Sequence, residues 1–511
     1  MFNKNARTKN ALKLSTINTA CYAIIAIAGV FYRMFFVRYL AVSYLGINGL
    51  FSNILQLLSL ADLGIIDCIN FRFYEPIHNS DVKRVGQLLN YMKKIYRLVA
   101  AVVFIVGLAV LPFIAFIIKD TSEIPADINI YLVYLLFLLN SVASYCFSYS
   151  YSLLSADQQG YKRSIYGTLV SVTGYVVRLL IIGYTGRFTL AIASTIVLTI
   201  FFNYIMHCYI ANAYKEVFAV RDQLEQSEKK NILSDAGKVL MHRLGGMIQD
   251  STDNILITLF SGVSICGLFS NYVVIINACR NIASKLLVSV SSSIGNAYAS
   301  MDEKGFFEIY RRLHFIDYYV SGLFATCAFA LASDFVTIWL GNGFLLDDLT
   351  VFCMCVSFYI ICSRFCNWSF INVTGLIAMD VIRPVLSVSM NLIASIVLGK
   401  ALGIAGVMIG TIISNICAVL WREVRLLYRE IFISENITAY WAKYVTNFVI
   451  TIICMFVSKR LLGMLFTSCE SLLVWLCEGI LCSVVFTLIF VLCNYRESIN
   501  AFDYIKNIRK K

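Results

Sequence analysis

Arginines inside long apolar segments are the residues of this sequence with the clearest chemical potential. Arg33, Arg243, Arg280 and Arg364 each lie within such a segment. An arginine at mid-membrane depth costs about 2.5–3.5 kcal/mol on insertion scales, so it usually faces water or a partner. A guanidinium stays charged in a low dielectric and offers paired donors that match a phosphate. We therefore predict that these four residues bind an anionic ligand.

Helical spacing places acidic residues beside one of these arginines. Arg243, Asp250 and Asn254 fall on one face of a helix, and Asp253 lies on its flank. Asp250 and Asp253 are candidates for ion coupling or for ion pairing. The simpler alternative is that Arg243 and Asp250 form a structural ion pair, because charges inside membranes commonly neutralise one another.

Two further segments carry polar faces. Asn277 shares a helical face with Arg280, and Gln56 belongs to a polar stripe that leads towards Asp62. Asn277 and Gln56 are predicted substrate contacts, and Asp62 is a candidate for coupling. Arg178 is a weaker candidate, because its segment has few other polar residues. Several polar faces on separate helices are what a water-filled cavity requires.

The elements that must position these residues are membrane-spanning helices. The chain has 511 residues, of which 59% are hydrophobic and 14% charged, and its mean hydropathy is +0.77. A soluble protein of this length could not bury so much apolar surface. Apolar runs of about 20 residues recur, and each can cross the hydrocarbon core as a helix. We predict an all-α integral membrane protein with about fourteen such helices, at 14–40, 43–73, 86–118, 129–155, 164–184, 188–210, 236–260, 267–298, 314–340, 348–374, 384–402, 404–428, 438–460 and 471–495.

A repeated pentapeptide indicates two similar halves. Gly-Leu-Phe-Ser-Asn occurs at 49–53 and again at 267–271, and the same offset relates the surrounding apolar spans. We predict two parallel six-helix repeats, followed by two extra helices. The predicted domains are an N-lobe at 1–214, a cytoplasmic linker at 215–235, a C-lobe at 236–430, helices 13 and 14 at 431–495, and a basic cytoplasmic tail at 496–511.

The distribution of basic residues predicts the orientation. Lys4, Arg7, Lys9 and Lys13 precede the first span, and most loop Lys and Arg fall on that same side of the predicted topology. The positive-inside rule therefore places both termini in the cytoplasm. The net charge of +12 reflects this bias together with the basic tail, which favours contact with anionic membrane lipids. A soluble basic module for nucleic acid is absent from the sequence, so we expect no nucleic-acid partner.

No cofactor or metal is expected. The 17 cysteines are scattered through apolar spans, where cysteine behaves as a small hydrophobe. The sequence has no Walker-type phosphate loop, no dinucleotide-binding glycine motif and no His/Glu zinc motif. We expect a protein that is not an enzyme and that draws on an ion gradient, the membrane potential or the substrate gradient.

Two segments carry a family resemblance. Residues 44–66 (YLGINGLFSNILQLLSLADLGII) and 242–272 (HRLGGMIQDSTDNILITLFSGVSICGLFSNY) resemble bacterial polysaccharide repeat-unit (Wzx-like) flippases, which belong to the multidrug/oligosaccharidyl-lipid/polysaccharide exporter superfamily. The resemblance implies transport of undecaprenyl-diphosphate-linked oligosaccharide from the cytoplasmic to the outer leaflet of the bacterial inner membrane. It implies that the two six-helix repeats form a V-shaped pair of lobes, with alternating access through a cationic central cavity. It also implies glycan polymerase and glycosyltransferases of the same pathway as partners.

Two other functions remain open at this point. A drug or metabolite cation antiporter of the same fold would favour twelve helices and a carboxylate-centred N-lobe. A membrane polymerase or ligase of glycans would need a sizeable catalytic segment outside the membrane. The longest predicted outer loop, at about 119–127, is too short for such a segment.

Overall fold

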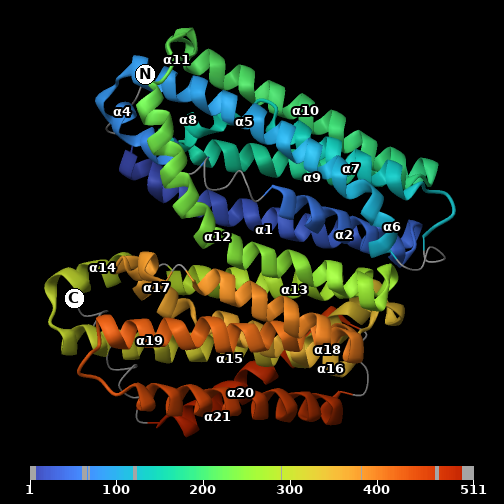
Figure 1. The fold of residues 1–511 in the computed structure, drawn as a ribbon. Coiled ribbons are helices and arrows are strands. Elements are labelled where there is room, and N and C mark those ends of the chain that lie inside the picture. The colour runs from blue at the N-terminus through green and yellow to red at the C-terminus, as the bar shows by residue number, and fades with distance from the viewer. Residues whose placement is uncertain are drawn as a thin grey trace. The chain divides into compact units, whose positions relative to one another are not determined.

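The described chain is helical, as predicted. The computed structural model describes residues 7–59, 66, 69–118, 124–288, 291–380, 382–466, 471–495 and 497 (Figure 1). Contacts divide the chain into two compact units, an N-terminal unit at Met1–Gly267 and a C-terminal unit at Leu268–Lys511. The division falls inside one helix, α13 (Val263–Val288).

The N-terminal unit is built on contacts between α1 and α9, α9 and α10, α7 and α10, α5 and α7, and α2 and α12. Its core is one continuous cluster of buried apolar side chains that extends from α1 into α12. The helices of this unit are α1 (Arg7–Tyr39), α2 (Val42–Leu58), α4 (Tyr74–Asn79), α5 (Val82–Val110), α6 (Ile114–Ile117), α7 (Ile130–Tyr145), α8 (Tyr151–Ala156), α9 (Gly160–Thr185), α10 (Phe188–Ala213), α11 (Lys215–Ala219) and α12 (Gln226–Ser261).

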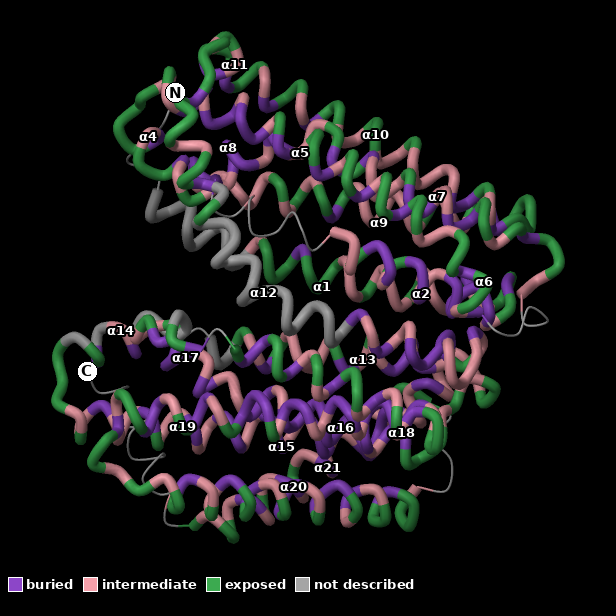
Figure 2. The backbone as a smooth tube through the Cα atoms, in the orientation of Figure 1, coloured by how far each residue is buried: buried purple, intermediate pink, exposed green. Residues whose placement is uncertain are grey.

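The C-terminal unit is arranged around α15 and α16. Helix α15 packs against α16, α20 and α21, and α16 also packs against α18. Figure 2 shows long buried stretches along α15 and α16 and more exposure on α20 and α21. The further helices of this unit are α14 (Ser291–Ser300), α15 (Glu303–Leu340), α16 (Asp348–Cys362), α17 (Phe365–Val373), α18 (Arg383–Ser414), α19 (Trp421–Glu430), α20 (Ile437–Leu465) and α21 (Leu472–Cys493).

The helices confirm a multi-pass membrane protein. The described residues contain 11 helical stretches that are long and apolar enough to cross a membrane. One of them, Arg383–Glu430, reverses direction at Gly403 and so supplies two crossings. The apolar helix α2 is shorter, and the long α12 is more polar than the others. With these additions the described helices agree with the predicted all-α fold of about fourteen spans.

The reversal at Gly403 is a helical hairpin without a loop. Gly403 has φ 58° and ψ −130°, which a residue with a side chain would adopt only under strain. The two arms are joined by buried polar contacts. The Asn391 amide donates to the Thr411 hydroxyl at 2.9 Å, and the Ser395 hydroxyl donates to the Val407 carbonyl at 3.2 Å. The predicted turn between 384–402 and 404–428 is confirmed at this glycine.

The boundary between the two units differs from the predicted one. The sequence indicated a linker at 215–235, but that segment contains α11 and the start of α12. It is docked on α5: the Asn90 amide donates to the Val220 carbonyl at 2.8 Å, and Lys83 pairs with Asp222 at 3.1 Å. Because α12 also packs against α2, it belongs with the N-terminal unit. The contacts therefore move the division to Gly267.

Glycines bring α2 against the start of α13. A Cβ added at Gly46 would lie 1.9 Å from the Val263 carbonyl oxygen, and one at Gly267 would lie 2.5 Å from the Val42 carbonyl oxygen. Small residues permit such close backbone approach between membrane helices. Gly267 begins the second copy of the pentapeptide, whereas Gly49, which begins the first copy, has open space at its Cβ position.

The Gly46→Ala variant is expected to lose about 1–3 kcal/mol of stability, because its methyl group would force α2 away from the Val263 carbonyl. Thermal unfolding of the detergent-purified protein measures this loss. Gly49→Ala is the matched control on the same helix and should be neutral or slightly stabilising, since alanine is the better helix former. Equal melting temperatures for the two variants would contradict the close contact.

Candidate functional site

Two arginines of the N-terminal unit lie beside a pair of stacked tyrosines. Helix α1 carries Tyr32 and Arg33, and helix α9 carries Tyr175 and Arg178. The Tyr32 and Tyr175 rings stack with centroids 4.8 Å apart. The Arg178 guanidinium lies 4.8 Å from the Tyr32 centroid and 5.2 Å from that of Tyr175. We call Tyr32, Arg33, Tyr175 and Arg178 the arginine–tyrosine cluster.

Arg33 is electrostatically part of this cluster. Its charge interacts with both Tyr32 and Tyr175, and the Tyr32 hydroxyl also interacts with Arg178. Arg178 donates its Nε–H to the Gly174 carbonyl at 3.1 Å, a contact within its own helix that orients the guanidinium. Two positive charges and two phenols thus gather where α1 packs against α9.

The chemistry of the arginine–tyrosine cluster suits an anion with sugar or aromatic substituents. Guanidinium groups bind phosphate through paired hydrogen bonds, and each tyrosine offers an apolar face with a polar hydroxyl. Cation–π contact holds the Arg178 side chain in place, while its remaining N–H groups can donate.

The structure describes the side chains of two other predicted residues of the N-terminal unit. Gln56 is exposed on α2, and Asp253 is 7% exposed on α12. Asp62 lies outside the described residues. Arg243 and Asp250 belong to α12, but their side chains also lie outside the described part of the structure. Their predicted roles stay predictions.

Arg280 and Asn277 lie on α13 in the C-terminal unit. Asn277 is exposed, whereas Arg280 is partly buried and interacts electrostatically with Cys362 of α16. The two residues are three positions apart on one helix, as the predicted polar face requires. Ligand binding by this pair remains a prediction.

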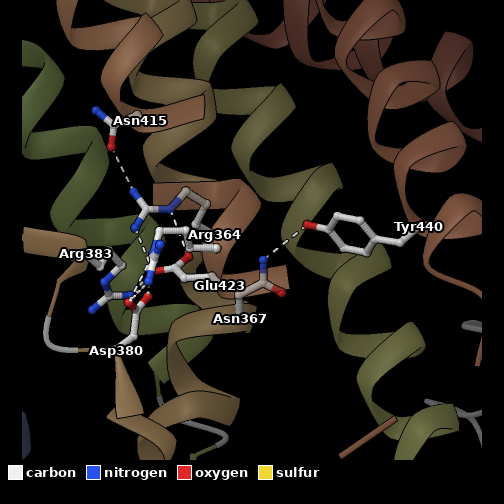
Figure 3. Close-up of polar contacts among 8 residues, drawn as sticks. Arg364, Asn367, Asp380, Arg383, Asn415, Glu423 and Tyr440 are labelled. Atoms are coloured by element: carbon white, nitrogen blue, oxygen red, sulfur yellow. Dashed lines mark hydrogen bonds and ion pairs between the residues drawn. The ribbon is translucent and has the colours of Figure 1, made fainter. Parts of the chain in front are cut away.

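Arg364 lies in a buried ion-pair network of the C-terminal unit (Figure 3). Its Nε and Nη2 donate to the two carboxylate oxygens of Glu423 at 3.0 and 2.8 Å, and its Nη1 donates to the Asn415 side-chain oxygen at 2.9 Å. Arg383 Nη1 contacts the same carboxylate at 2.6 Å. Glu423 is fully buried. The sequence predicted that Arg364 binds substrate; in the structure its guanidinium is paired with this carboxylate, and substrate binding by Arg364 stays a prediction.

A second ion pair extends this network. Arg422 contacts the Asp380 carboxylate through Nε at 3.0 Å and through Nη2 at 2.5 Å. The Arg383 guanidinium also lies 5.3 Å from the Trp368 ring centroid, which adds a cation–π contact. The network thus joins the start of α18 to α17 and α19. These ion pairs hold the ends of the three helices together. The arginine–tyrosine cluster is therefore the better candidate for ligand binding.

Sequence reasoning undervalued Arg178 and missed both tyrosines. Tyr175 lies three residues before Arg178, a spacing that brings side chains together on a helix and could have been noticed. The contribution of Tyr32 depends on the packing of α1 against α9, which residue spacing alone does not encode. The side chains that surround Arg178 in the structure are aromatic, whereas the sequence analysis considered only polar neighbours.

Comparison with known proteins identifies the fold as one used by membrane transporters. Lipid II flippase MurJ in an inward-closed conformation aligns over 93% of this chain and 99% of its own, with a TM-score of 0.68 and 12% identity. An inward-facing multidrug resistance MATE family transporter of the MOP superfamily aligns over 80% of this chain and 94% of its own, with a TM-score of 0.59 and 14% identity.

A variant of the Vibrio cholerae MATE transporter VcmN gives a similar result, with a TM-score of 0.55 and 14% identity over 85% of this chain and 99% of its own. No protein-family model and no curated protein matches the sequence. At these identities the alignments establish the shared fold, and substrate must be argued from the residues.

Proposed function

We propose that this protein is a flippase that moves undecaprenyl-diphosphate-linked oligosaccharide repeat units across the bacterial inner membrane for assembly of a surface polysaccharide. The arginine–tyrosine cluster carries the proposal, because two guanidinium groups within apolar helices suit a diphosphate headgroup. The fold shared with lipid II flippase MurJ supports it, since that protein also acts on a lipid. Transport would proceed by alternating access.

Orientation and partners form part of the same proposal. Both termini would lie in the cytoplasm, because the basic loops and the basic tail then face the inside. The oligosaccharide would arrive from membrane glycosyltransferases and pass to a glycan polymerase of the same pathway. The protein itself would act without a cofactor and without enzymatic activity.

A cation antiporter is the second candidate. The MATE transporters that share the fold favour it, and so does the buried carboxyl group of Asp253 in the N-terminal unit. The two candidates require opposite charges at the substrate, so substrate charge discriminates them.

Reconstitution tests the proposal directly. Proteoliposomes would contain a fluorescent lipid-diphosphate disaccharide, and an impermeant reductant would report how fast the label changes leaflet. We expect wild-type protein to accelerate this exchange and Arg33→Ala to slow it about tenfold, the loss that follows from one charge-assisted contact. The same vesicles loaded with a cationic dye serve as the comparison. Transport of the dye without movement of the lipid would overturn the proposal in favour of the antiporter.

A further inference from the structure

A fully buried carboxyl group lies in the C-terminal unit, outside the sites described above. Asp317 on α15 is 0% exposed. Its Oδ2 accepts the backbone N–H of Cys366 at 2.9 Å, and its Oδ1 accepts the Ser321 hydroxyl at 3.3 Å. Both donors are neutral. Among the described residues, no lysine or arginine forms an ion pair with this group.

The ionisable groups that interact directly with Asp317 are phenols and thiols, and Arg364 in turn interacts with two of them, Cys362 and Tyr444. These phenols and thiols come from every helix that surrounds it: Tyr359 and Cys362 from α16, Cys366 from α17 and Tyr444 from α20. On α15 itself, His314 lies one turn earlier, and Lys443 of α20 interacts electrostatically with it. Helix α21 contributes a neutral contact nearby, between the Thr487 and Tyr319 hydroxyls at 3.0 Å. Within the described part of the chain the Asp317 carboxyl group has hydrogen bonds but no ion-pair partner, and a buried carboxylate without such a partner tends to bind a proton.

The two hydrogen bonds of Asp317 can serve either protonation state. A carboxylate accepts from the Ser321 hydroxyl, and a carboxylic acid donates to the same oxygen after the hydroxyl rotates. The Cys366 N–H can donate to Oδ2 in both states. Both oxygens of the carboxyl group can therefore keep a hydrogen-bond partner in either protonation state.

A buried histidine, His314, lies in the same region as Asp317. His314 is 4% exposed, and its Nε2 lies 2.7 Å from the Asn367 side-chain oxygen, which also accepts the Tyr310 hydroxyl at 2.7 Å. That oxygen only accepts, so Nε2 carries the proton and Nδ1 is the basic nitrogen. Nδ1 is buried without a hydrogen-bond partner in the described structure. An unoccupied basic nitrogen thus lies one turn from Asp317.

From these contacts we infer that Asp317 is a proton-binding site of the C-terminal unit. A proton taken from solvent forms an O–H bond at the carboxyl group and neutralises its charge. Asp317 binds the first turn of α17 through Cys366, next to the break in helix between Cys362 and Phe365. Protonation weakens the attraction between a carboxylate and this helix N-terminus. Proton occupancy therefore controls how firmly α17 is held to α15.

Infrared difference spectroscopy of the full-length protein in lipid nanodiscs tests this inference. Spectra recorded in acidic and alkaline buffer should differ by the carbonyl band of a buried carboxylic acid, and the band should shift in heavy water. We expect Asp317→Asn to remove the band. Glu478→Gln is the matched control, because Glu478 is a second buried carboxyl group of this unit at 3% exposure, and it should retain the band.

Three results would overturn the inference. They are a wild-type protein without a titrating carboxylic-acid band, an Asp317→Asn variant that keeps it, and a Glu478→Gln variant that loses it. If Asp317→Asn fails to fold, Asp317→Glu answers the same question, since it should move the band, and an unchanged band would again exclude Asp317. The measurement needs no substrate, so its outcome is independent of the proposed flippase function.

Discussion

The Glu423→Gln variant is expected to lower the free energy of unfolding by about 3–5 kcal/mol, the largest stability loss anticipated in this protein. Glu423 is fully buried and is shared by two guanidinium groups, those of Arg364 and Arg383. Glutamine has nearly the same shape but cannot balance either charge. Removing the carboxylate charge therefore leaves two guanidinium groups without a balancing anion, although Arg364 keeps its contact with Asn415 and Arg383 keeps its contact with Trp368.

Thermal unfolding of the purified protein in detergent would measure this loss. Glu430→Gln is the matched control on the same helix, α19, because Glu430 pairs with the exposed side chain of Arg429. An exposed ion pair contributes little, so this control should change stability by less than about 1 kcal/mol. If Glu423→Gln were as stable as the control, the network would not hold α17, α18 and α19 together.

Replacing both arginines of the arginine–tyrosine cluster with glutamine is expected to reduce movement of a lipid diphosphate by roughly 100-fold. Each single variant, Arg33→Gln or Arg178→Gln, should cost about tenfold, the effect of one charge-assisted hydrogen bond. Arg178→Lys keeps the charge but loses the planar fork, so we expect it to recover part of the activity. The proteoliposome assay described above measures all four proteins.

The control for this series is Arg163→Gln. Arg163 lies on the same helix, α9, and its guanidinium is 5.2 Å from the Tyr151 ring centroid, so it makes the same type of contact at another level. It should transport at the wild-type rate. A loss equal to that of Arg178→Gln would mean that cation–π contacts on α9 act through stability and that the cluster does not select the anion.

Much of the fold could be predicted from the sequence, because apolar length and helix-breaking residues are local properties. The hairpin at Gly403 is an example: two apolar runs meet at a glycine, and the structure reverses there. Helix starts follow similar local signals, since Asp81, Asn129 and Asp347 each accept backbone N–H groups of the helix that follows.

The site was less predictable because it depends on contacts between distant segments. Arg364 meets a carboxylate 59 residues further along the chain, whereas helical spacing reveals only partners three or four residues away. The division by contacts at Gly267 differs from the predicted linker for the same reason. Lys215–Ala219 and the residues after it resemble a polar linker in composition, but their contacts with α5 are formed only in the folded chain.

The hairpin at Gly403 has a consequence for biogenesis. Its two arms carry Asn391, Ser395 and Thr411, and the hydrogen bonds of these groups are completed only when both arms are present. An unpaired amide in hydrocarbon is costly, so the first arm alone would be a poor candidate for release into lipid. The ribosome has to extend the chain by only about a helix length before the second arm emerges. The two arms should therefore leave the translocon together, as one inserted pair.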